Sequence, residues 1–295
     1  MSYLYIIIAA ALWGTTGAFS NLILSYCPLS SLQIGAVRVI STVLLLFIWL
    51  LIVDREAFKI KLKDLWVFVG TGILSLSFFT YCYFVSIKLN GVAIAAVLLY
   101  TAPIFVAIIS ALVFKIRLTV FKIIAIVLVV FGCCLVSGIL SHSSYSLTII
   151  GLLYGIGSGF GYSLYTIFAK VAILKGYKSL TVTFYTFLFS SFAFVPLSLF
   201  DNNRALNIST SFFILVIIFV LFGLITGALP YIFYTKGLQK TEPSLSSIIS
   251  TVEPIVASIF GIFVFNEKLT LSIIFGIVLI IFSIIIGSIN VKKVE

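Results

Sequence analysis

The chain has 295 residues, of which 62% are hydrophobic and 9% are charged, and its mean hydropathy is +1.33. Such a composition excludes an ordinary soluble domain and is typical of an integral membrane protein. The formal net charge of +10 does not point to nucleic acid as a partner, because the basic residues form small groups beside apolar segments rather than one continuous stripe.

Apolar segments long enough to cross a bilayer recur along the whole chain, and the segments between them are too short to form a soluble domain. They predict ten transmembrane helices, at residues 3–24, 31–53, 66–87, 91–114, 119–138, 148–174, 181–200, 212–236, 243–265 and 270–290. The expected fold class is therefore all-α and integral to the membrane.

Lysine and arginine concentrate in alternate loops between the predicted helices. One set of loops holds only Lys88, Arg204 and Lys268, whereas nearly all of the other basic residues lie in the opposite set. The positive-inside rule assigns the basic loops to the cytoplasm. We therefore expect a multi-pass protein of the plasma or inner membrane with both termini in the cytoplasm.

A repeat relates the two halves of the chain. Pro103 and Pro254 are 151 residues apart, and the same spacing separates Leu118 from Leu269, each of which is followed by threonine. Because each half holds five predicted helices, the second half enters the membrane from the opposite side. We therefore predict two inverted five-helix repeats, residues 1–140 and 141–295. Repeats of this kind build secondary transporters that bind substrate near the midplane and work by alternating access.

Basic residues also lie inside or at the ends of predicted helices. Arg38 is a few residues into the second helix, where it could bind a substrate carboxylate, snorkel to the surface or pair with the backbone. Of these interpretations we prefer snorkelling or a structural pair. Lys170 and Lys236, at the cytoplasmic ends of two helices, are expected to be snorkelling anchors, although either could attract an anionic substrate.

Tyrosines mark the third and eighth predicted helices. They lie nearer the helix ends than the middle, where they are as consistent with an interfacial belt as with a gate. As candidates for a gate or a cavity lining we take six residues, Tyr81, Tyr83, Tyr231, Tyr234, Pro103 and Pro254.

The ninth predicted helix contains a carboxylate, Glu253, within a long apolar run. A charge at the centre of a membrane helix costs about 2.5–3.5 kcal/mol on insertion scales, so an intramembrane acid is by default a functional candidate. Pro254 cannot donate to the carbonyl of Ser250, which is left free beside the acid. We expect Glu253 and Ser250 to bind substrate or exchange a proton; the alternative is a buried acid held by a hydroxyl. The repeat counterpart of Glu253 is Ala102, so the repeat does not require the acid.

Three aromatic residues lie at about the same depth as Glu253, near the middle of their helices. They are Trp13, Tyr100 and Tyr162. Aromatic faces around an acid suit an organic cation, at about 0.5–2 kcal/mol each. We expect them to bind substrate, although ordinary packing is an equally good explanation.

Five short motifs resemble the EamA branch of the drug/metabolite transporter superfamily. They are Leu12-Trp13-Gly14, Arg38, the stretch 99–105, Val252-Glu253-Pro254 and the stretch 266–270. The resemblance covers nearly the whole chain, one EamA-like repeat in each half. It implies a carrier of small organic solutes whose central cavity is lined mainly by the first, third, fourth, sixth, eighth and ninth helices. Many relatives export amino acids or other metabolites, and some import amines such as choline.

The sequence argues against two other classes of membrane protein. A metal-dependent intramembrane hydrolase needs a pattern such as His-Glu-x-x-His, which a single histidine cannot supply. A channel fits an inverted repeat less well than a carrier does. The chain also lacks the Gly-x-x-x-x-Gly-Lys-Ser/Thr loop, so it is not expected to hydrolyse nucleotide.

We therefore predict a secondary transporter, not an enzyme, that moves a small polar metabolite such as an amino acid or amine, preferably outward. The alternative is an importer or a multidrug-type carrier of organic cations, and an intramembrane hydrolase is a remote alternative. No cofactor or metal is expected, and coupling to protons is left open. The expected partners are a small-molecule substrate and the lipid bilayer, with the chain as a monomer or weak homodimer.

Overall fold

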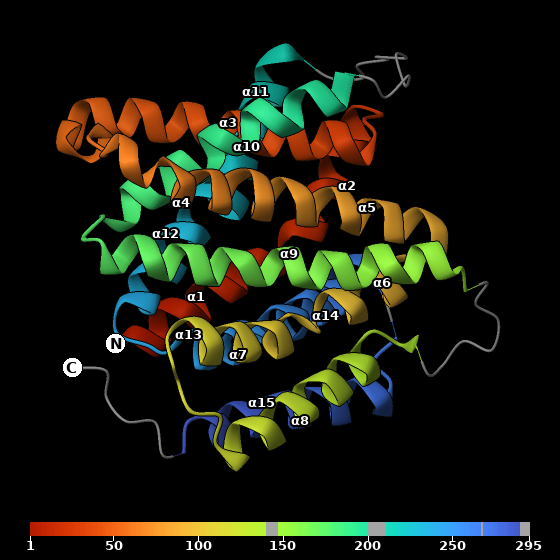
Figure 1. Ribbon diagram of the computed structural model, residues 1–295. Coiled ribbons are helices and arrows are strands. Elements are labelled where there is room, and N and C mark those ends of the chain that lie inside the picture. Colours follow the sequence, from red (N-terminus) through yellow and green to blue (C-terminus); the bar gives the residue numbers. More distant parts are fainter. Residues whose placement is uncertain (140–146, 200–210, 267, 290–295) are drawn as a thin grey trace.

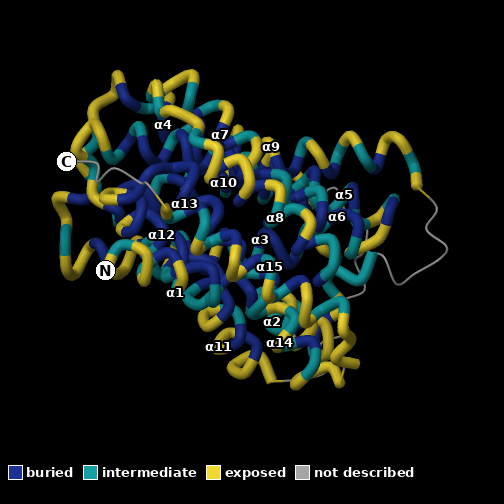
Figure 2. The backbone as a smooth tube through the Cα atoms, turned by 90° about the horizontal axis from the view of Figure 1, so that it is seen from below, coloured by how far each residue is buried: buried dark blue, intermediate teal, exposed yellow. Residues whose placement is uncertain are grey.

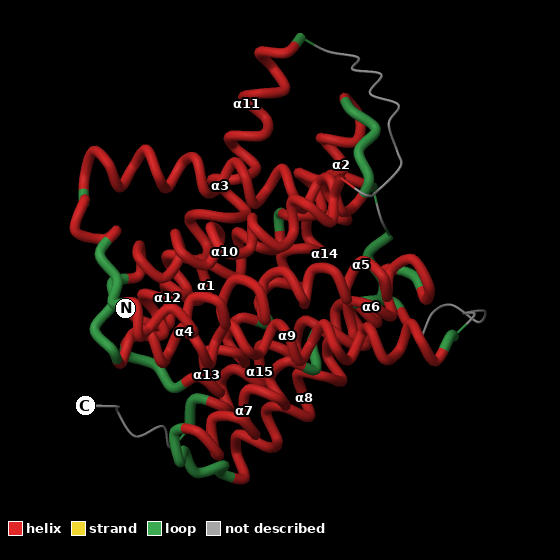
Figure 3. Tube along the Cα trace, turned by 45° about the horizontal axis from the view of Figure 1, so that its top comes forward, coloured by secondary structure: helices red, strands yellow, loops and turns green. Residues whose placement is uncertain are grey.

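The computed structural model of the protein describes residues 1–139, 147–199, 211–266 and 268–289. In these four ranges every regular element is a helix, and Figure 3 shows the helices joined by short loops. The all-α fold class predicted from the sequence is confirmed.

The first half of the chain forms five helical segments, several of them interrupted. They are α1 (Ser2–Gly14) with α2 (Thr16–Tyr26); α3 (Ser31–Val53); α4 (Leu65–Val69), η3 (Gly70–Ser77) and α5 (Phe78–Asn90); α6 (Val92–Leu99) with α7 (Ala102–Val113); and α8 (Val120–Val136). Two short helices, η1 (Arg55–Phe58) and η2 (Leu62–Asp64), join α3 to α4.

The second half repeats this order. Its five segments are α9 (Ile149–Leu174); α10 (Ser179–Leu199); α11 (Phe212–Phe222), η5 (Gly223–Ala228) and α12 (Leu229–Gln239); α13 (Pro243–Ser250) with α14 (Val252–Phe265); and α15 (Leu271–Gly287). Seven of the segments are long and apolar enough to cross a membrane, α8 and α15 are shorter apolar helices, and α9 has 26 residues. Within the described ranges these ten segments match the ten predicted helices one for one.

The two halves break their helices at equivalent places. The break between α6 and α7 comes just before Pro103, and the break between α13 and α14 comes just before Pro254. Proline has no N–H to donate to the carbonyl four residues earlier, so the helix is weakened there. The hydroxyl of Thr251 donates to the carbonyl of Ile248 (2.5 Å), which satisfies one acceptor at the end of α13.

Wide, π-helical turns also occur at equivalent places, η3 in the third segment and η5 in the eighth. Each turn presents a glycine to a helix of the other half. A Cβ on Gly72 would lie 2.6 Å from the carbonyl oxygen of Thr186 in α10, and one on Gly223 would overlap Ser41 in α3. Glycine is needed at both positions because the partner helices approach so closely.

The packing of the segments has the symmetry of an inverted repeat. α8 packs against α15, which lie side by side in Figure 1, and α3 packs against α10. α1 packs against α12 as α9 packs against α5, and α1 contacts α13 and α14 as α9 contacts α6 and α7. Exchanging the halves therefore maps the α8–α15 and α3–α10 contacts onto themselves and maps the contacts of α1 onto those of α9. The two halves are two inverted five-helix repeats, as predicted from the sequence.

Apolar side chains cover the outside of the bundle as well as its interior. Figure 2 shows buried segments in the middle and exposed turns around them. Exposed residues on the outer turns include Leu112 (75%) and Phe263 (80%). In water such a surface is unfavourable, but in a membrane the acyl chains cover it. The fold thus places its polar chemistry inside the bundle.

Candidate substrate cavity

A cavity of about 550 Å³ enters the bundle from one end and reaches its middle. Its mouth is lined by the exposed residues Asn21, Leu24, Ser31 and Val92, and we call this the open end. α1 and α2 run from Ser2 toward the mouth, so the open end is opposite the end where the chain begins. Residues of α3 line the cavity in addition to the six helices implied by the family resemblance.

Trp13 forms part of the cavity wall because α1 packs very closely against α14. A Cβ on the next residue, Gly14, would lie 2.8 Å from the carbonyl oxygen of Glu253 and 2.7 Å from Val256. The helix then breaks, and the hydroxyl of Thr15 donates to the carbonyl of Leu12 (2.7 Å). The tryptophan-glycine pair therefore brings an indole ring beside the acid.

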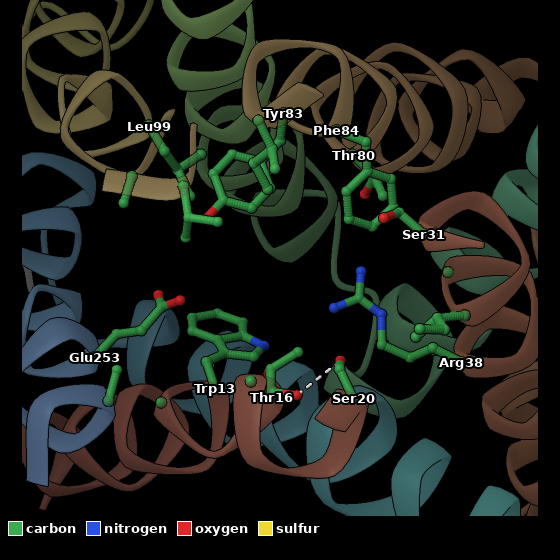
Figure 4. Close-up of a pocket in the computed structure, with 18 of the residues that line it drawn as sticks. Trp13, Thr16, Ser20, Ser31, Arg38, Thr80, Tyr83, Phe84, Leu99 and Glu253 are labelled. Atoms are coloured by element: carbon green, nitrogen blue, oxygen red, sulfur yellow. Dashed lines mark hydrogen bonds between the residues drawn. The ribbon is translucent and has the colours of Figure 1, made fainter. Parts of the chain in front are cut away.

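Glu253 lies in the first turn of α14, directly after the break, and its carboxylate faces the cavity (Figure 4). Its main polar neighbours are the Arg38 guanidinium, which acts on it electrostatically, and the hydroxyl of Tyr162. Tyr162 also interacts with Ser250, which is buried behind the acid and outside the cavity lining. The hydroxyl of Ser250 donates to the carbonyl of Ser247 (2.7 Å).

Arg38 reaches the same cavity from α3, and in Figure 4 it points into the open space opposite Glu253. Within the described residues its buried Nε atom has no hydrogen-bond partner. The backbone carbonyl of Arg38 accepts bonds from Ser41 (3.2 Å) and Thr42 (2.7 Å), which holds this turn of α3 in place. The structure thus places Arg38 in the lining of the cavity, while the sequence-based preference for snorkelling or a structural pair stays a prediction.

The two charges face one cavity without pairing. None of the four ion pairs found in the described residues includes Glu253 or Arg38. Both charges also break the repeat. α3 and α10 begin at Ser31 and Ser179, and seven residues further on Arg38 corresponds to Thr186, whose hydroxyl bonds to Thr71 (2.8 Å). The repeated architecture is thus built at these positions without a charge.

The walls differ between the two charges. Around Glu253 they are aromatic, with Trp13, Tyr83, Tyr100 and Tyr162. Around Arg38 they carry hydroxyls and an amide, from Thr16, Ser20, Asn21, Ser31 and Thr80. In Figure 4 the hydroxyl of Ser20 donates to the carbonyl of Thr16 (2.9 Å) on the Arg38 side. The cavity therefore has an acidic, aromatic inner part and a basic, hydroxyl-rich outer part.

The remaining predicted gate or lining residues divide into four groups. Tyr83 and Tyr231 line the cavity, whereas Tyr81 lies outside its lining and packs edge-on against the ring of Tyr154. Tyr234 is buried beneath the cavity, with its ring 5.4 Å from that of Trp13. Pro103 and Pro254 are buried at the helix breaks and do not line the cavity.

Below Trp13 the bundle is sealed, and we call this the closed end. The hydroxyls of Tyr165 and Thr235 share a hydrogen bond (3.0 Å), as do those of Thr166 and Tyr234 (2.7 Å). These four residues join α9 to α12. The ring of Tyr231 packs against those of Tyr165 (4.9 Å) and Phe187 (4.9 Å), which fills the space between them.

Charged groups also hold the closed end together, through contacts between residues far apart in the sequence. Lys170, expected to be a snorkelling anchor, is 5% exposed and donates to the carbonyls of Leu238 (2.8 Å) and Thr241 (3.2 Å). Lys122 at the start of α8 forms a buried ion pair with Glu242 at the start of α13. Among the described residues no group of three or more His, Cys, Asp or Glu could hold a metal ion.

Comparison with known proteins places this arrangement among transporters. A model of the EamA-like transporter family matches the chain twice, over residues 1–138 and 149–289. The chain is 28% identical to an uncharacterized transporter of Bacillus subtilis strain 168, YwfM, covering 98% of this chain and 94% of the relative. It is 25% identical to the uncharacterized inner membrane transporter YicL of Salmonella typhimurium, covering 98% and 96%. One solved crystal structure shares the fold, with a TM-score of 0.81 at 13% identity over 97% of this chain and 96% of that chain.

Proposed function

Because the chain belongs to the EamA-like transporter family, we propose that it is a secondary carrier of small zwitterionic metabolites such as amino acids. The observation that carries this proposal is that Glu253 and Arg38 face one cavity from opposite sides and that neither forms an ion pair with another described residue. A substrate with an ammonium group and a carboxylate would satisfy both charges at once. We propose export as the direction, since many proteins of this family export metabolites.

The walls of the cavity support one orientation of such a substrate. Its ammonium group binds Glu253, where the faces of Trp13, Tyr100 and Tyr162 add cation–π attraction. Its carboxylate binds Arg38, because the guanidinium can hold two carboxylate oxygens with parallel N–H donors. The substrate side chain then lies among the hydroxyls and apolar groups nearer the mouth. We therefore assign substrate selection to Glu253 and Arg38 together.

Neutralising both charges would also favour closure of the cavity. An isolated charge is unfavourable away from water, whereas a paired and hydrogen-bonded charge is much less so. With no substrate or proton bound, Glu253 and Arg38 favour a hydrated, open cavity. With a zwitterion bound, both are paired and the open end can seal. This difference gives a physical basis for alternating access, in which the loaded cavity is the one that closes.

The repeat identifies the residues that would seal the open end. Trp13 and Tyr162 face each other across the site, with rings 6.1 Å apart, and taking them as counterparts relates Thr16 to Tyr165 and Asn21 to Lys170. The spacing of 151 residues relates Tyr83 to Tyr234 and Ile87 to Leu238. The open-end partners in these pairs all line the cavity. We propose that they come together, as their counterparts do now, when the closed end opens.

A pair of introduced cysteines tests this exchange. Leu238 is fully buried at the closed end, whereas its counterpart Ile87 lines the cavity at the open end. In a background without the four native cysteines, Ile87→Cys should react with a water-soluble thiol reagent and Leu238→Cys should not. A substrate that drives transport should lower the reactivity at 87 and raise it at 238. Reactivities that stay fixed in the presence of a transported substrate would contradict alternating access.

Proton coupling is part of the proposal, with Glu253 as the group that binds either the substrate ammonium or a proton. In proteoliposomes a proton gradient should drive accumulation of substrate by the wild-type protein, while Glu253→Gln should lose the response to the gradient.

The orientation of the protein in the membrane is a further part of the proposal. The loops at the closed end carry the basic residues Lys61, Lys63, Lys175 and Lys240, so we propose that this end faces the cytoplasm. Reagents added from one side of sealed vesicles test that assignment.

A carrier of organic cations is the second candidate, favoured by the four aromatic residues around Glu253. The substrate of such a carrier has no carboxylate for Arg38 to bind. Proteoliposome uptake of an amino acid and of the amine that lacks its carboxylate separates the two functions. We expect the amino acid to be transported and the amine to be taken up poorly, and the opposite ranking would favour the cation carrier.

A further inference from the structure

A second cavity lies outside the substrate pathway, at the closed end between α1, α10 and α12. We propose that it binds the phosphate headgroup of an anionic phospholipid from the leaflet at that end. The cavity has a volume of about 510 Å³, and its basic lining residues are Lys178, directly before α10, Lys236 of α12 and Lys240, the C-cap of α12. It shares no lining residue with the substrate cavity, so its ligand is a different one.

The charge of this cavity is strongly one-sided. No acidic residue is among its lining residues. Lys178 is held by Asp54 at 2.7 Å, but within the described residues neither Lys236 nor Lys240 takes part in an ion pair. Two unpaired ammonium groups beside a third basic group form a site for an anion. Lysine binds phosphate as a compact point charge with three donors, so it needs no fixed fork geometry.

The surroundings favour a lipid over a soluble anion. On α1 the lining residue Tyr5 stacks against Phe233 of α12, with ring centroids 6.0 Å apart, and Leu4 beside it is 56% exposed. An aromatic and apolar surface therefore borders the basic groups at the level where a helix leaves the membrane. A phospholipid can place its phosphate on the lysines and its acyl chains on that surface. Basic pockets between membrane helices commonly recognise anionic headgroups in this way.

The position of the cavity gives the lipid a structural consequence. The side-chain amide of Gln239 donates to the hydroxyl of Ser179 (3.3 Å), so α12 and α10 already touch at its edge. A phosphate shared by Lys178, directly before α10, and Lys236 of α12 would add a second link between these helices. α12 also carries Tyr234 and Thr235, which seal the closed end. Binding of the lipid should therefore stabilise the closed end.

Native mass spectrometry of the detergent-purified protein tests the site directly. Phosphatidylglycerol should remain bound, whereas phosphatidylcholine with the same acyl chains should not. The double variant Lys236→Gln/Lys240→Gln should bind phosphatidylglycerol at least about tenfold more weakly than the wild-type protein does. Lys236→Arg/Lys240→Arg should bind it like wild type, which separates loss of charge from misfolding.

A second double variant controls for charge in general. Lys61→Gln/Lys63→Gln also removes two positive charges from the closed end, but both residues lie outside the cavity lining. This variant should leave lipid binding unchanged. Equal losses in the two glutamine variants would overturn the proposal, because they would mean general attraction to a basic surface. Displacement of the lipid by millimolar inorganic phosphate or glycerol phosphate would also overturn it, in favour of a soluble anion.

Discussion

Tyr234 at the closed end shares a hydrogen bond with Thr166 and packs on Trp13, whereas its repeat counterpart Tyr83 at the open end faces the cavity. The same contrast holds for Lys170, which donates to three chain carbonyls, and its counterpart Asn21, which lies exposed at the mouth. Two halves with one architecture are therefore seen in two different states. Part of the difference lies in polar contacts that α9 makes with α12 and with Thr241.

The closed end also has charges for which the open end has no equivalent. Lys122 and Glu242 correspond, at the spacing of 151 residues, to Ile273 and Gly91. The ion pair thus occurs once, at the closed end, and so does the bonding of Lys170. Because of this asymmetry, the repeat alone does not set the equilibrium between the state with the closed end sealed and the state with the open end sealed. We infer that the charged contacts favour the state in which the closed end is sealed.

The largest effect is expected when the buried ion pair between Lys122 and Glu242 is broken. Glu242→Gln leaves the buried ammonium of Lys122 without its counter-charge, which typically destabilises a protein by about 3–5 kcal/mol. The thermal unfolding midpoint should fall, and a cysteine at 238 should become reactive. Lys122→Met/Glu242→Leu should recover most of the loss. A single variant as stable as wild type would show that the pair does not hold the closed end.

Removing the lysine that bonds to chain carbonyls should have the next largest effect. Lys170→Met takes the donor away from the carbonyls of Leu238 and Thr241, at a cost of about 2–3 kcal/mol for buried acceptors left unsatisfied. Reactivity of the cysteine at 238 should rise by about tenfold or more. Asn21→Met at the equivalent open-end position is the control and should leave that reactivity unchanged. Equal changes in reactivity in the two variants would contradict the proposed difference between the two ends.

A single hydroxyl separates the two ends by a smaller amount. Tyr234→Phe removes the bond to Thr166 and should shift the equilibrium toward opening by about 1 kcal/mol, or about fivefold. Tyr83→Phe removes a hydroxyl that faces the cavity, so it should not open the closed end. We expect it to act in the opposite sense, by weakening the sealed form of the open end. Cysteine reactivity at 87 and 238 measures both shifts.

An exposed ion pair at the closed end should matter least. Lys59 and Glu56 form a surface pair three residues apart, with both side chains mostly in solvent. Exposed pairs contribute little because water and salt screen them. Glu56→Gln should therefore leave both the unfolding midpoint and cysteine reactivity at 238 unchanged. A shift as large as that of Lys170→Met would mean that any charge at this end influences the state.

The features that could be predicted from sequence depend on local chemistry. Long apolar runs predict the ten helices, because the length of a run is a local property. The prolines predict a missing hydrogen bond, as at the carbonyl of Ser250, but not the breaks before Pro103 and Pro254, since residues 91–114 and 243–265 are each predicted as one helix. Glu253 stood out because a carboxylate is costly in any apolar helix. Trp13 and Tyr162, which line the cavity, were candidates because of their depth in the membrane alone. None of these inferences required knowledge of how the helices pack.

The features that were missed depend on which helix faces meet. Arg38 faces the cavity only because the opposite side of α3 packs on α10 and η5. Tyr81 and Tyr83 are two residues apart on one helix, and only Tyr83 lines the cavity. Lys170 binds carbonyls 68 to 71 residues away, and Lys122 pairs with an acid 120 residues away. Contacts of such long range are set by tertiary packing, which hydrophobic pattern does not reveal.

The pairing of Glu253 and Arg38 with one zwitterion is tested most directly by a matched set of ligands. Thermal stability of the purified protein would be measured with an amino acid, its amide, which lacks the carboxylate, and its N-acetyl form, which lacks the ammonium group. We predict that only the intact amino acid stabilises the wild-type protein strongly, and that Glu253→Gln and Arg38→Gln each abolish this effect. Stabilisation by the amide equal to that by the amino acid, unchanged in Arg38→Gln, would contradict the two-charge site.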